Sequence, residues 1–392
     1  GKGRAWYPVW NSGSTYTLAM RVGAELSMME NRFTPARFKD GYGPVGAWFL
    51  LFKAKTLNGL GEAFAGSDAA KAELENYAPY GTAAITPTCL RNHLMLFEMK
   101  EGRGPIMMDT VTALAELGKT MDKKELKHLE SEAWEDFLDM TCGQANLWCA
   151  TDTEPEKKNS EVMPTEPYLL GSHSGCCGLW TSGPDEDWVP DAYKIKADNG
   201  KVYNRMTTVN GLFTAGDGVG CSGHKFSSGS HAEGRMAVKQ MVRYAKDHAD
   251  FQPAIAQSNE ELVDHVYKPV RTYMDHCDYS TADDVNPNYI KPNGMMYRMM
   301  KATHEYGAGT ATFYQTTTKN LEIVMDLLQT MREDNEKLAA GDLHELMRAW
   351  EIQHRIWTVE SHLRHIQYRK ETRYPGFYYQ ADYPGQDDEN WF

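Results

Sequence analysis

The segment 212–218, Leu-Phe-Thr-Ala-Gly-Asp-Gly, is the most specific local pattern in this 392-residue chain. It predicts a short buried strand that ends in a Gly-Asp turn, and a helix predicted over 230–245 follows it. A carboxylate at the carboxyl end of such a strand lies where open α/β sheets bind ligands, and it can accept hydrogen bonds from polyol hydroxyls. The free N–H groups at the helix start favour an anionic group. Together they predict a ligand site that includes Gly216, Asp217, Ser230 and His231. Either half alone would fit an ordinary strand, turn and serine-capped helix equally well.

Composition excludes several classes of protein. With 41 basic and 54 acidic residues the net charge is −13, which argues against a nucleic-acid or anionic-membrane surface. The longest apolar run, 47–52, is far shorter than the ~20 residues that cross a bilayer. None of the seven cysteines forms a CxxC pair, so no zinc or iron–sulfur pattern is present, and no metal site is predicted. The cysteine spacing favours a reducing cytoplasm.

Local patterns give a coarse outline of the chain. The pair Asn199-Gly200 predicts a hairpin turn between two alternating segments. Helical spacing predicts a helix over 18–29, whereas 47–55 fits a buried helix or strand equally well. From about residue 255 the chain reads as helical, with apolar residues three or four apart: Leu321, Val324, Leu327, Leu328, Met331, Leu343, Leu346, Met347, Trp350, Ile356, Val359, Leu363 and Ile366. His362 and His365 lack a third acidic ligand, so packing is the better interpretation.

The strand, Gly-Asp turn and helix, in that order, resemble the second flavin-contacting segment of the fumarate reductase/succinate dehydrogenase flavoprotein superfamily. Residues 13–15 with 23–26, and 369–373 near the end, resemble other segments of that superfamily. Its GxGxxG fingerprint is absent, and the chain opens on Gly1, so we expect an internal fragment that lacks the N-terminal part.

Within that superfamily the chain departs from the dicarboxylate enzymes. They carry His-Pro-Thr near the position of 33–37 and an arginine near 225–227, and this chain has neither. It is similar instead to the alpha subunits of dissimilatory adenylylsulfate reductases. The segments that carry this similarity are 3–10, 35–50, 171–178 and 223–226.

The resemblance implies a mixed α+β and α/β multidomain fold. It implies a partial FAD-binding Rossmann-like domain (1–30 and 186–250), an α+β capping domain (31–185) and a C-terminal helical domain (251–392). The implied reaction is the FAD-dependent, reversible reduction of adenylylsulfate to AMP and sulfite through a flavin N5–sulfite adduct. Electrons would be exchanged with a ferredoxin-like beta subunit carrying two [4Fe–4S] clusters, in a cytoplasmic heterodimer, with a membrane complex as a candidate electron source.

The resemblance also assigns site residues. Arg37, His173 and Trp6 match catalytic positions, and Ser14 joins the cofactor-binding set named above. The positions that would bind the nucleotide are Phe49, Leu50, Arg91 and Phe226. Without the resemblance, Arg37 would read as a surface arginine, His173 as a structural histidine and Trp6 as a core residue. Adjacent Cys176 and Cys177 would strain a disulfide, so packing is expected there.

Two other functions stay open at this point. A dicarboxylate oxidoreductase of the fumarate reductase or aspartate oxidase type would share the fold. A non-catalytic nucleotide-binding or assembly protein could keep it without turnover, although the joint presence of Arg37, His173 and Asp217 speaks against that interpretation.

Overall fold

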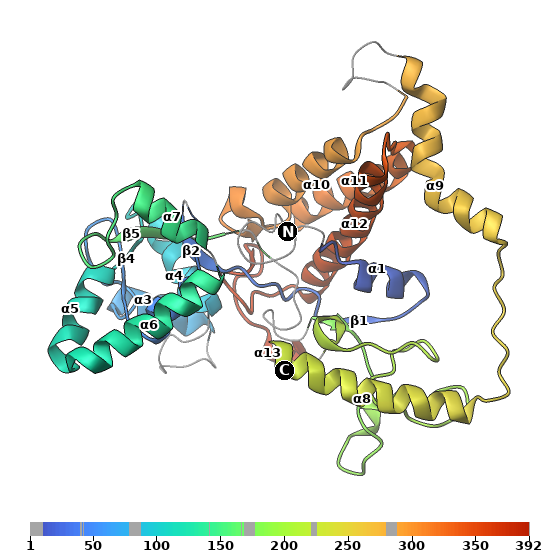
Figure 1. The fold of residues 1–392 in the computed structure, drawn as a ribbon, viewed down its shortest axis with the longest axis horizontal. Helices are drawn as coiled ribbons and strands as arrows, with labels where there is room; N and C mark the ends of the chain where they lie inside the picture. The colour runs from blue at the N-terminus through green and yellow to red at the C-terminus, as the bar shows by residue number, and fades with distance from the viewer. Residues whose placement is uncertain are drawn as a thin grey trace.

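The computed structural model describes residues 11–39, 41, 43–77, 88–140, 142–165, 167, 177–220, 226–279 and 288–391. More than half of the chain is helical, and the described strands are short and form three small sheets. Figure 1 shows the elements of residues 36–164 as a group on the left, set apart from the long helices of residues 226–369. This mixed multidomain arrangement confirms the predicted fold class.

Residues 36–164 form a four-stranded antiparallel sheet with helices packed around it. The strands are β2 (Ala36–Phe38), β3 (Thr56–Leu57), β4 (Met107–Met108) and β5 (Ser160–Pro164), in the order β2-β5-β4-β3. The helices are α2 (Gly46–Leu50), α3 (Asp68–Leu74), α4 (Thr88–Lys100), α5 (Thr110–Thr120), α6 (Lys123–Met140) and α7 (Cys142–Ala150). The rings of Phe38, Trp48 and Trp148 meet edge to face, with centroids 5.1 to 6.4 Å apart. This aromatic core fixes the strand β2 that carries Arg37.

A second region surrounds the predicted Gly-Asp turn. Helix α1 (Ser14–Arg21) leads into β1 (Leu26–Ser27), which pairs antiparallel with β6 (Gly178–Leu179). The predicted hairpin is confirmed, because Lys196 and Val202 form an antiparallel bridge around Asn199-Gly200. The predicted strand 212–215 is reduced to one bridge at Phe213, followed by a 3₁₀ turn at Gly216–Gly218. The helix predicted over 230–245 is confirmed as part of α8 (Phe226–Asp247).

The C-terminal part is a bundle of α10 (Pro292–Tyr306), α11 (Thr318–Asp334) and α12 (Leu343–Arg369). Its helical prediction is confirmed, and Leu328 and most of its predicted partners are buried. Leu327 (37% exposed), Leu343 and Met347 lie outside the core, contrary to the prediction, because only one stripe of each helix faces its neighbours. Helix α1 packs on α12, where Thr17 Oγ1 lies 3.3 Å from Thr358 Oγ1.

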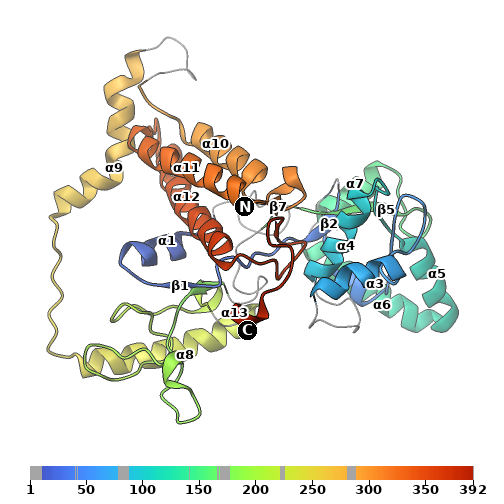
Figure 2. The same cartoon turned by 180° about the vertical axis from the view of Figure 1, so that it is seen from behind.

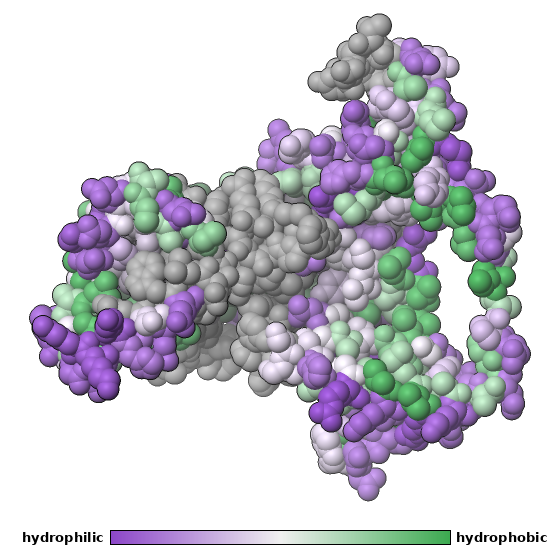
Figure 3. All heavy atoms as spheres, viewed as in Figure 1, coloured by the Kyte–Doolittle hydropathy of each residue, from purple (hydrophilic) through white to green (hydrophobic). Residues whose placement is uncertain are grey.

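The remaining described elements are short or stand apart. Strand β7 (Gln315–Thr316) pairs in parallel with β8 (Tyr379–Gln380), and α13 (Asp388–Trp391) follows. Helix α9 (Asn259–His276) extends away from the bundle, as Figures 1 and 2 both show. Exposed apolar side chains of α1, α8 and α9 give the hydrophobic surface on the right of Figure 3. Among the described residues, no helix combines the length and the apolar character that a bilayer crossing requires.

Two local predictions need correction. The helix predicted over 18–29 is wrong beyond Arg21, because Gly23 takes a left-handed φ of +92° and the chain then enters β1. The ambiguous segment 47–55 is helical only within α2, and the remainder is irregular. The domain boundaries at 30, 185 and 250 stay a prediction.

Candidate functional site

The 216–218 turn rests directly on helix α8. Gly216 has a left-handed φ of +67°, which favours glycine, and a Cβ atom there would lie 3.1 Å from Ser230 Oγ. Asp217 is exposed at the tip of this turn, and His231 is exposed on α8 beside Ser230. The structure therefore brings together the four residues that the sequence grouped as one ligand site.

The start of α8 differs from the sequence-based expectation. The helix is described from Phe226, so Ser230 and His231 lie in its second turn. Their N–H groups belong to the helical ladder, whereas the free N–H groups of a helix are those of its first turn. The anion-favouring end of α8 therefore lies before Ser230.

Two hydrogen bonds fix the backbone of the turn. The N–H of Gly216 donates to Glu233 Oε2 at 2.9 Å, and the hydroxyl of Tyr16 donates to the backbone carbonyl of Asp217 at 3.1 Å. Glu233 is only 4% exposed, and its Oε1 lies 3.7 Å from Arg205 Nη2. Burial raises the pKa of Tyr16 well above its usual value, so this phenol stays protonated as a donor. Helices α1 and α8 thus hold the turn from two sides.

Ser14 lies at the start of α1, next to the same turn. A Cβ atom on Gly218 would lie 2.8 Å from Thr15 Cγ2, so the two segments are in close contact. The hydroxyl of Ser14 is hydrogen-bonded to His354 Nδ1 at 2.9 Å and to Ser12 Oγ at 2.9 Å. Burial lowers the pKa of His354, which favours the neutral imidazole. Ser14 is therefore near the predicted cofactor site and is hydrogen-bonded to α12 through His354.

Arg37 is a buried residue and not a surface arginine. It occupies the middle of β2, is 6% exposed, and pairs in register with Met163 of β5. Lys39, two residues on, is exposed and forms an ion pair with Glu161 at 2.8 Å. A buried guanidinium needs charged or hydrogen-bonding partners. Burial therefore indicates that Arg37 either binds a ligand or belongs to a network of hydrogen bonds and ion pairs.

Phe49 and Arg91 form a stacked pair. The guanidinium carbon of Arg91 lies 4.6 Å from the ring centroid of Phe49, which brings α2 and α4 together. Burial lowers the pKa of Arg91, and its Nη2 donates to Thr88 Oγ1 at 3.2 Å. Leu50, the next residue on α2, is 66% exposed. An aromatic face, a cation and an exposed aliphatic side chain thus stand next to one another.

Four residues named in the sequence analysis fall wholly or partly outside this description. Trp6 and His173 lie outside the described residues, and so does Cys176. Phe226 is described only as the first residue of α8, without its side chain. The meeting of Arg37 with His173, and of Phe49 with Phe226, therefore stays a prediction.

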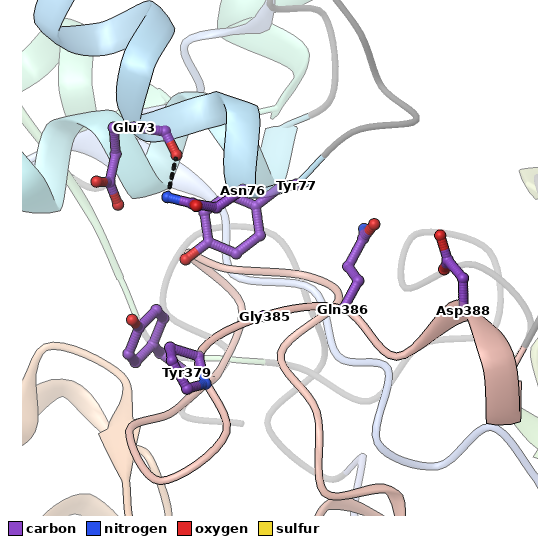
Figure 4. A pocket seen from close by; sticks show the side chains of 8 residues that line it. Glu73, Asn76, Tyr77, Tyr379, Gly385, Gln386 and Asp388 are labelled. Carbon is purple, nitrogen blue, oxygen red and sulfur yellow. Dashed lines mark hydrogen bonds between the residues drawn. The ribbon is translucent and has the colours of Figure 1, made fainter.

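A separate cavity of about 430 Å³ lies between α3 and the C-terminal segment (Figure 4). Its lining residues are Glu73, Asn76, Tyr77, Tyr379, Pro384, Gly385, Gln386 and Asp388. None of the predicted site residues whose side chains the structure describes lines it. Within the described ranges no group of three metal-ligating side chains is found, and His362 Nδ1 donates to the carbonyl of Met29 at 2.7 Å.

Sequence reasoning missed Tyr16 and Glu233. Neither belongs to a motif, and both contact the turn only through the fold. The single available signal was the i,i+3 spacing of Ser230 and Glu233, which places both on one face of a helix.

Comparison with known proteins shows what the chain is similar to. No protein-family model matches it. The adenylylsulfate reductase alpha subunit of Megalodesulfovibrio gigas is 60% identical over 391 residues, which is all but one residue of this chain. Along nearly its whole length the chain is similar to an adenylylsulfate reductase alpha subunit. It spans 59% of the length of that relative.

Solved structures of adenylylsulfate reductases have the same fold as this chain. An adenosine-5-phosphosulfate reductase in complex with sulfite (covalent adduct) and the adenylylsulfate reductase of Archaeoglobus fulgidus each match with 51% identity and a TM-score of 0.91. Each match covers 99% of this chain and 60% of the other chain. The E. coli quinol fumarate reductase matches with 17% identity and a TM-score of 0.62, over 100% of this chain and 60% of that chain, which shows a shared fold alone.

Proposed function

We propose that this chain provides the substrate-binding and part of the flavin-binding machinery of an adenylylsulfate reductase. In the reaction, adenylylsulfate takes up two electrons, the bond from sulfur to the phosphate oxygen breaks, and AMP and sulfite are released. The observation that carries the proposal is the 60% identity over nearly the whole chain. The buried Arg37 and the stacked Phe49–Arg91 pair support it, because they suit a sulfonate and a purine nucleotide respectively.

The nucleotide would bind at Phe49. One face of a phenyl ring can stack on adenine, and stacking of this kind contributes about 1–3 kcal/mol per base. Arg91, already held against that ring, would reach the nucleotide, and the exposed Leu50 would add apolar contact. Phe226 would cover the second face of the base.

The sulfur-bearing anion would bind at Arg37. A guanidinium presents paired N–H donors that match two oxygens of a sulfate-type anion, and burial strengthens such bonds. His173 would hydrogen-bond the sulfite oxygens or give a proton to the leaving phosphate. Trp6 would form the apolar wall of the same site.

The residues at the 216–218 turn fit an FAD. Gly216 lets the turn lie close against α8, because a Cβ atom there would crowd Ser230 Oγ, and the Asp217 carboxylate is exposed beside it. Asp217 would accept hydrogen bonds from the polyol hydroxyls of the cofactor, with Gly216, Ser14, Ser230 and His231 around it. The bound flavin would supply two-electron chemistry and, at N5, the atom that bonds sulfite. The relative described with a covalent sulfite adduct supports this last point.

Electrons would come from a partner. The chain has no cluster-ligating cysteine spacing, so the proposal includes a ferredoxin-like beta subunit with two [4Fe–4S] clusters. We propose a cytoplasmic heterodimer.

The deciding experiment measures sulfite oxidation by the complete enzyme with its partner and an artificial electron acceptor. The proposal expects turnover that depends on AMP. Turnover of fumarate, succinate or aspartate without any AMP requirement would favour the dicarboxylate alternative. Flavin absorbance that does not bleach on titration with sulfite would favour a non-catalytic binding protein.

A further inference from the structure

We infer that Glu233 is a positioning residue of the flavin site, whose buried carboxylate holds the 216–218 turn and so directs Asp217 toward the cofactor. The inference rests on the proposed function, since it assigns a role within that flavin site. Glu233 belongs to no sequence motif, and its role is inferred only from its contacts in the structure.

Burial of the Glu233 carboxylate is specific and costly. The side chain lies on the third turn of α8 and is 4% exposed, and an ionised group in such a place is unfavourable unless it is paired and hydrogen-bonded. The two carboxylate oxygens of Glu233 have different partners. Oε2 accepts the Gly216 N–H at 2.9 Å, and Oε1 faces Arg205 Nη2 at 3.7 Å. An apolar side chain of the same size would leave the Gly216 N–H without this acceptor.

The contact sets the register of the turn on the helix. Ser230 and Glu233 are three residues apart and lie on one face of α8. Gly216 touches both, since its N–H reaches Glu233 and its Cα hydrogens face Ser230 Oγ. The turn therefore cannot slide along α8 without losing the Glu233 bond or moving into Ser230.

The same turn is held on its other side by α1. Tyr16 donates its hydroxyl to the backbone carbonyl of Asp217 at 3.1 Å. The N–H of Gly216 and the carbonyl of Asp217 are thus both fixed, and these two groups bracket the backbone that carries the Asp217 side chain. With both ends of this short backbone segment set, the Cα–Cβ bond that carries the exposed carboxylate of Asp217 has a defined direction.

The test measures FAD affinity of the holoenzyme by fluorescence titration after removal and re-addition of the cofactor. The variants are Glu233→Leu, Glu233→Gln, Asp217→Asn and the double variant Glu233→Leu/Asp217→Asn. Glu260→Gln is the matched control, because Glu260 is an exposed carboxylate on α9. We expect Glu233→Leu to weaken FAD binding about tenfold, since a buried N–H loses its acceptor. Glu233→Gln keeps an oxygen acceptor and should remain within about threefold of the parent and of Glu260→Gln.

The double variant separates positioning from general stability. If Glu233 acts through Asp217, the double variant binds FAD no more weakly than Asp217→Asn alone, because the carboxylate to be directed is already gone. Additive losses, or a Glu233→Leu variant equal to the parent, would overturn the inference while leaving the proposed function intact. A parent holoenzyme that binds no FAD would overturn both. Should Glu233→Leu fail to fold, Glu233→Asp, whose shorter side chain cannot reach Gly216, takes its place in the cycle.

Discussion

The substitution Glu371→Gln tests how strongly the C-terminal segment is held by buried charge. Glu371 is fully buried, and its Oε1 accepts from Arg369 Nε at 2.7 Å and from Arg373 Nε at 3.0 Å. Its Oε2 accepts from Arg373 Nη2 at 2.9 Å and from the N–H of Asp387 at 2.9 Å. Glutamine has nearly the same shape, so the change removes charge and one acceptor without opening a cavity.

Arg369 Nη2 also donates to Oε1, so five hydrogen bonds reach the carboxylate, and the magnitude follows from the two at Oε2. One side-chain oxygen becomes an NH₂ group that faces two donors, so one charged and one backbone hydrogen bond are lost, worth about 1.5–3 and 0.5–1.5 kcal/mol. The buried guanidinium of Arg373 and the partly buried one of Arg369 also lose a shared counter-charge. Arg369 keeps its bond to Glu30 at 2.7 Å and Arg373 keeps Asp388 at 2.8 Å, which limits the loss. We expect the free energy of unfolding to fall by about 3–5 kcal/mol, the range for a broken buried pair.

The assay is urea denaturation followed by circular dichroism, at pH 7 and moderate salt. Glu116→Gln is the control, because Glu116 forms an exposed ion pair with Lys119 at 2.6 Å, and its loss should cost less than about 1 kcal/mol. A Glu371→Gln protein within about 1 kcal/mol of the parent would refute the reasoning, since it would mean that the buried carboxylate contributes no more than a surface one.

Three further predictions concern the site, the core and acid stability. Arg37→Ala should lower sulfite turnover by at least about tenfold with little change in flavin content. Lys39→Ala, at an exposed position two residues away, should change neither quantity. Loss of flavin from the Arg37→Ala protein would contradict the assigned role. Leu328→Ala should lower the free energy of unfolding by about 2–5 kcal/mol, because Leu328 is fully buried. Leu327→Ala should lower it by much less, because Leu327 is partly exposed. If urea denaturation gave equal losses of stability for the two variants, the packing described for α11 would be contradicted. Burial lowers the pKa of His362 from 6.5 to about 3, so the unfolded chain binds one more proton between these values and stability falls as the pH drops below about 6.5. His362→Gln keeps a donor for the carbonyl of Met29 without titrating, and urea midpoints at pH 7 and pH 5 should differ less in this variant than in the parent.

What could be predicted from the sequence depended on local signals. Helix α8, the hairpin at Asn199-Gly200 and the helical C-terminal part follow from apolar spacing and turn chemistry within a few residues, and the structure confirms them. The 216–218 turn with Ser230 was also predictable, because both halves lie within 20 residues. These features need no knowledge of what packs against them.

Burial of Arg37 could not be predicted in the same way. The residue stands close to Lys39 and Asp40, a polar context that is typical of a surface. Its strand is three residues long and pairs with β5, more than a hundred residues further along the chain. Only the resemblance to a family singled it out. The role of Glu233 was missed for a related reason, because its contact with Gly216 depends on how the turn lies on the helix.

The packing of α1 on α12 has a consequence for folding during synthesis. Thr17 and Thr358 are 341 residues apart in the chain, yet their hydroxyl oxygens lie 3.3 Å from each other. At about 5–20 residues per second, a ribosome needs roughly 20 to 70 s to make the intervening polypeptide. Throughout that time Thr17 has no native partner, whereas Tyr16 and Ala19 on the same helix pack against residues 24–29 and 177–179, which are made much earlier. The 216–218 turn can therefore form as soon as α8 has emerged, whereas the contact of Thr17 with α12 is among the last to form.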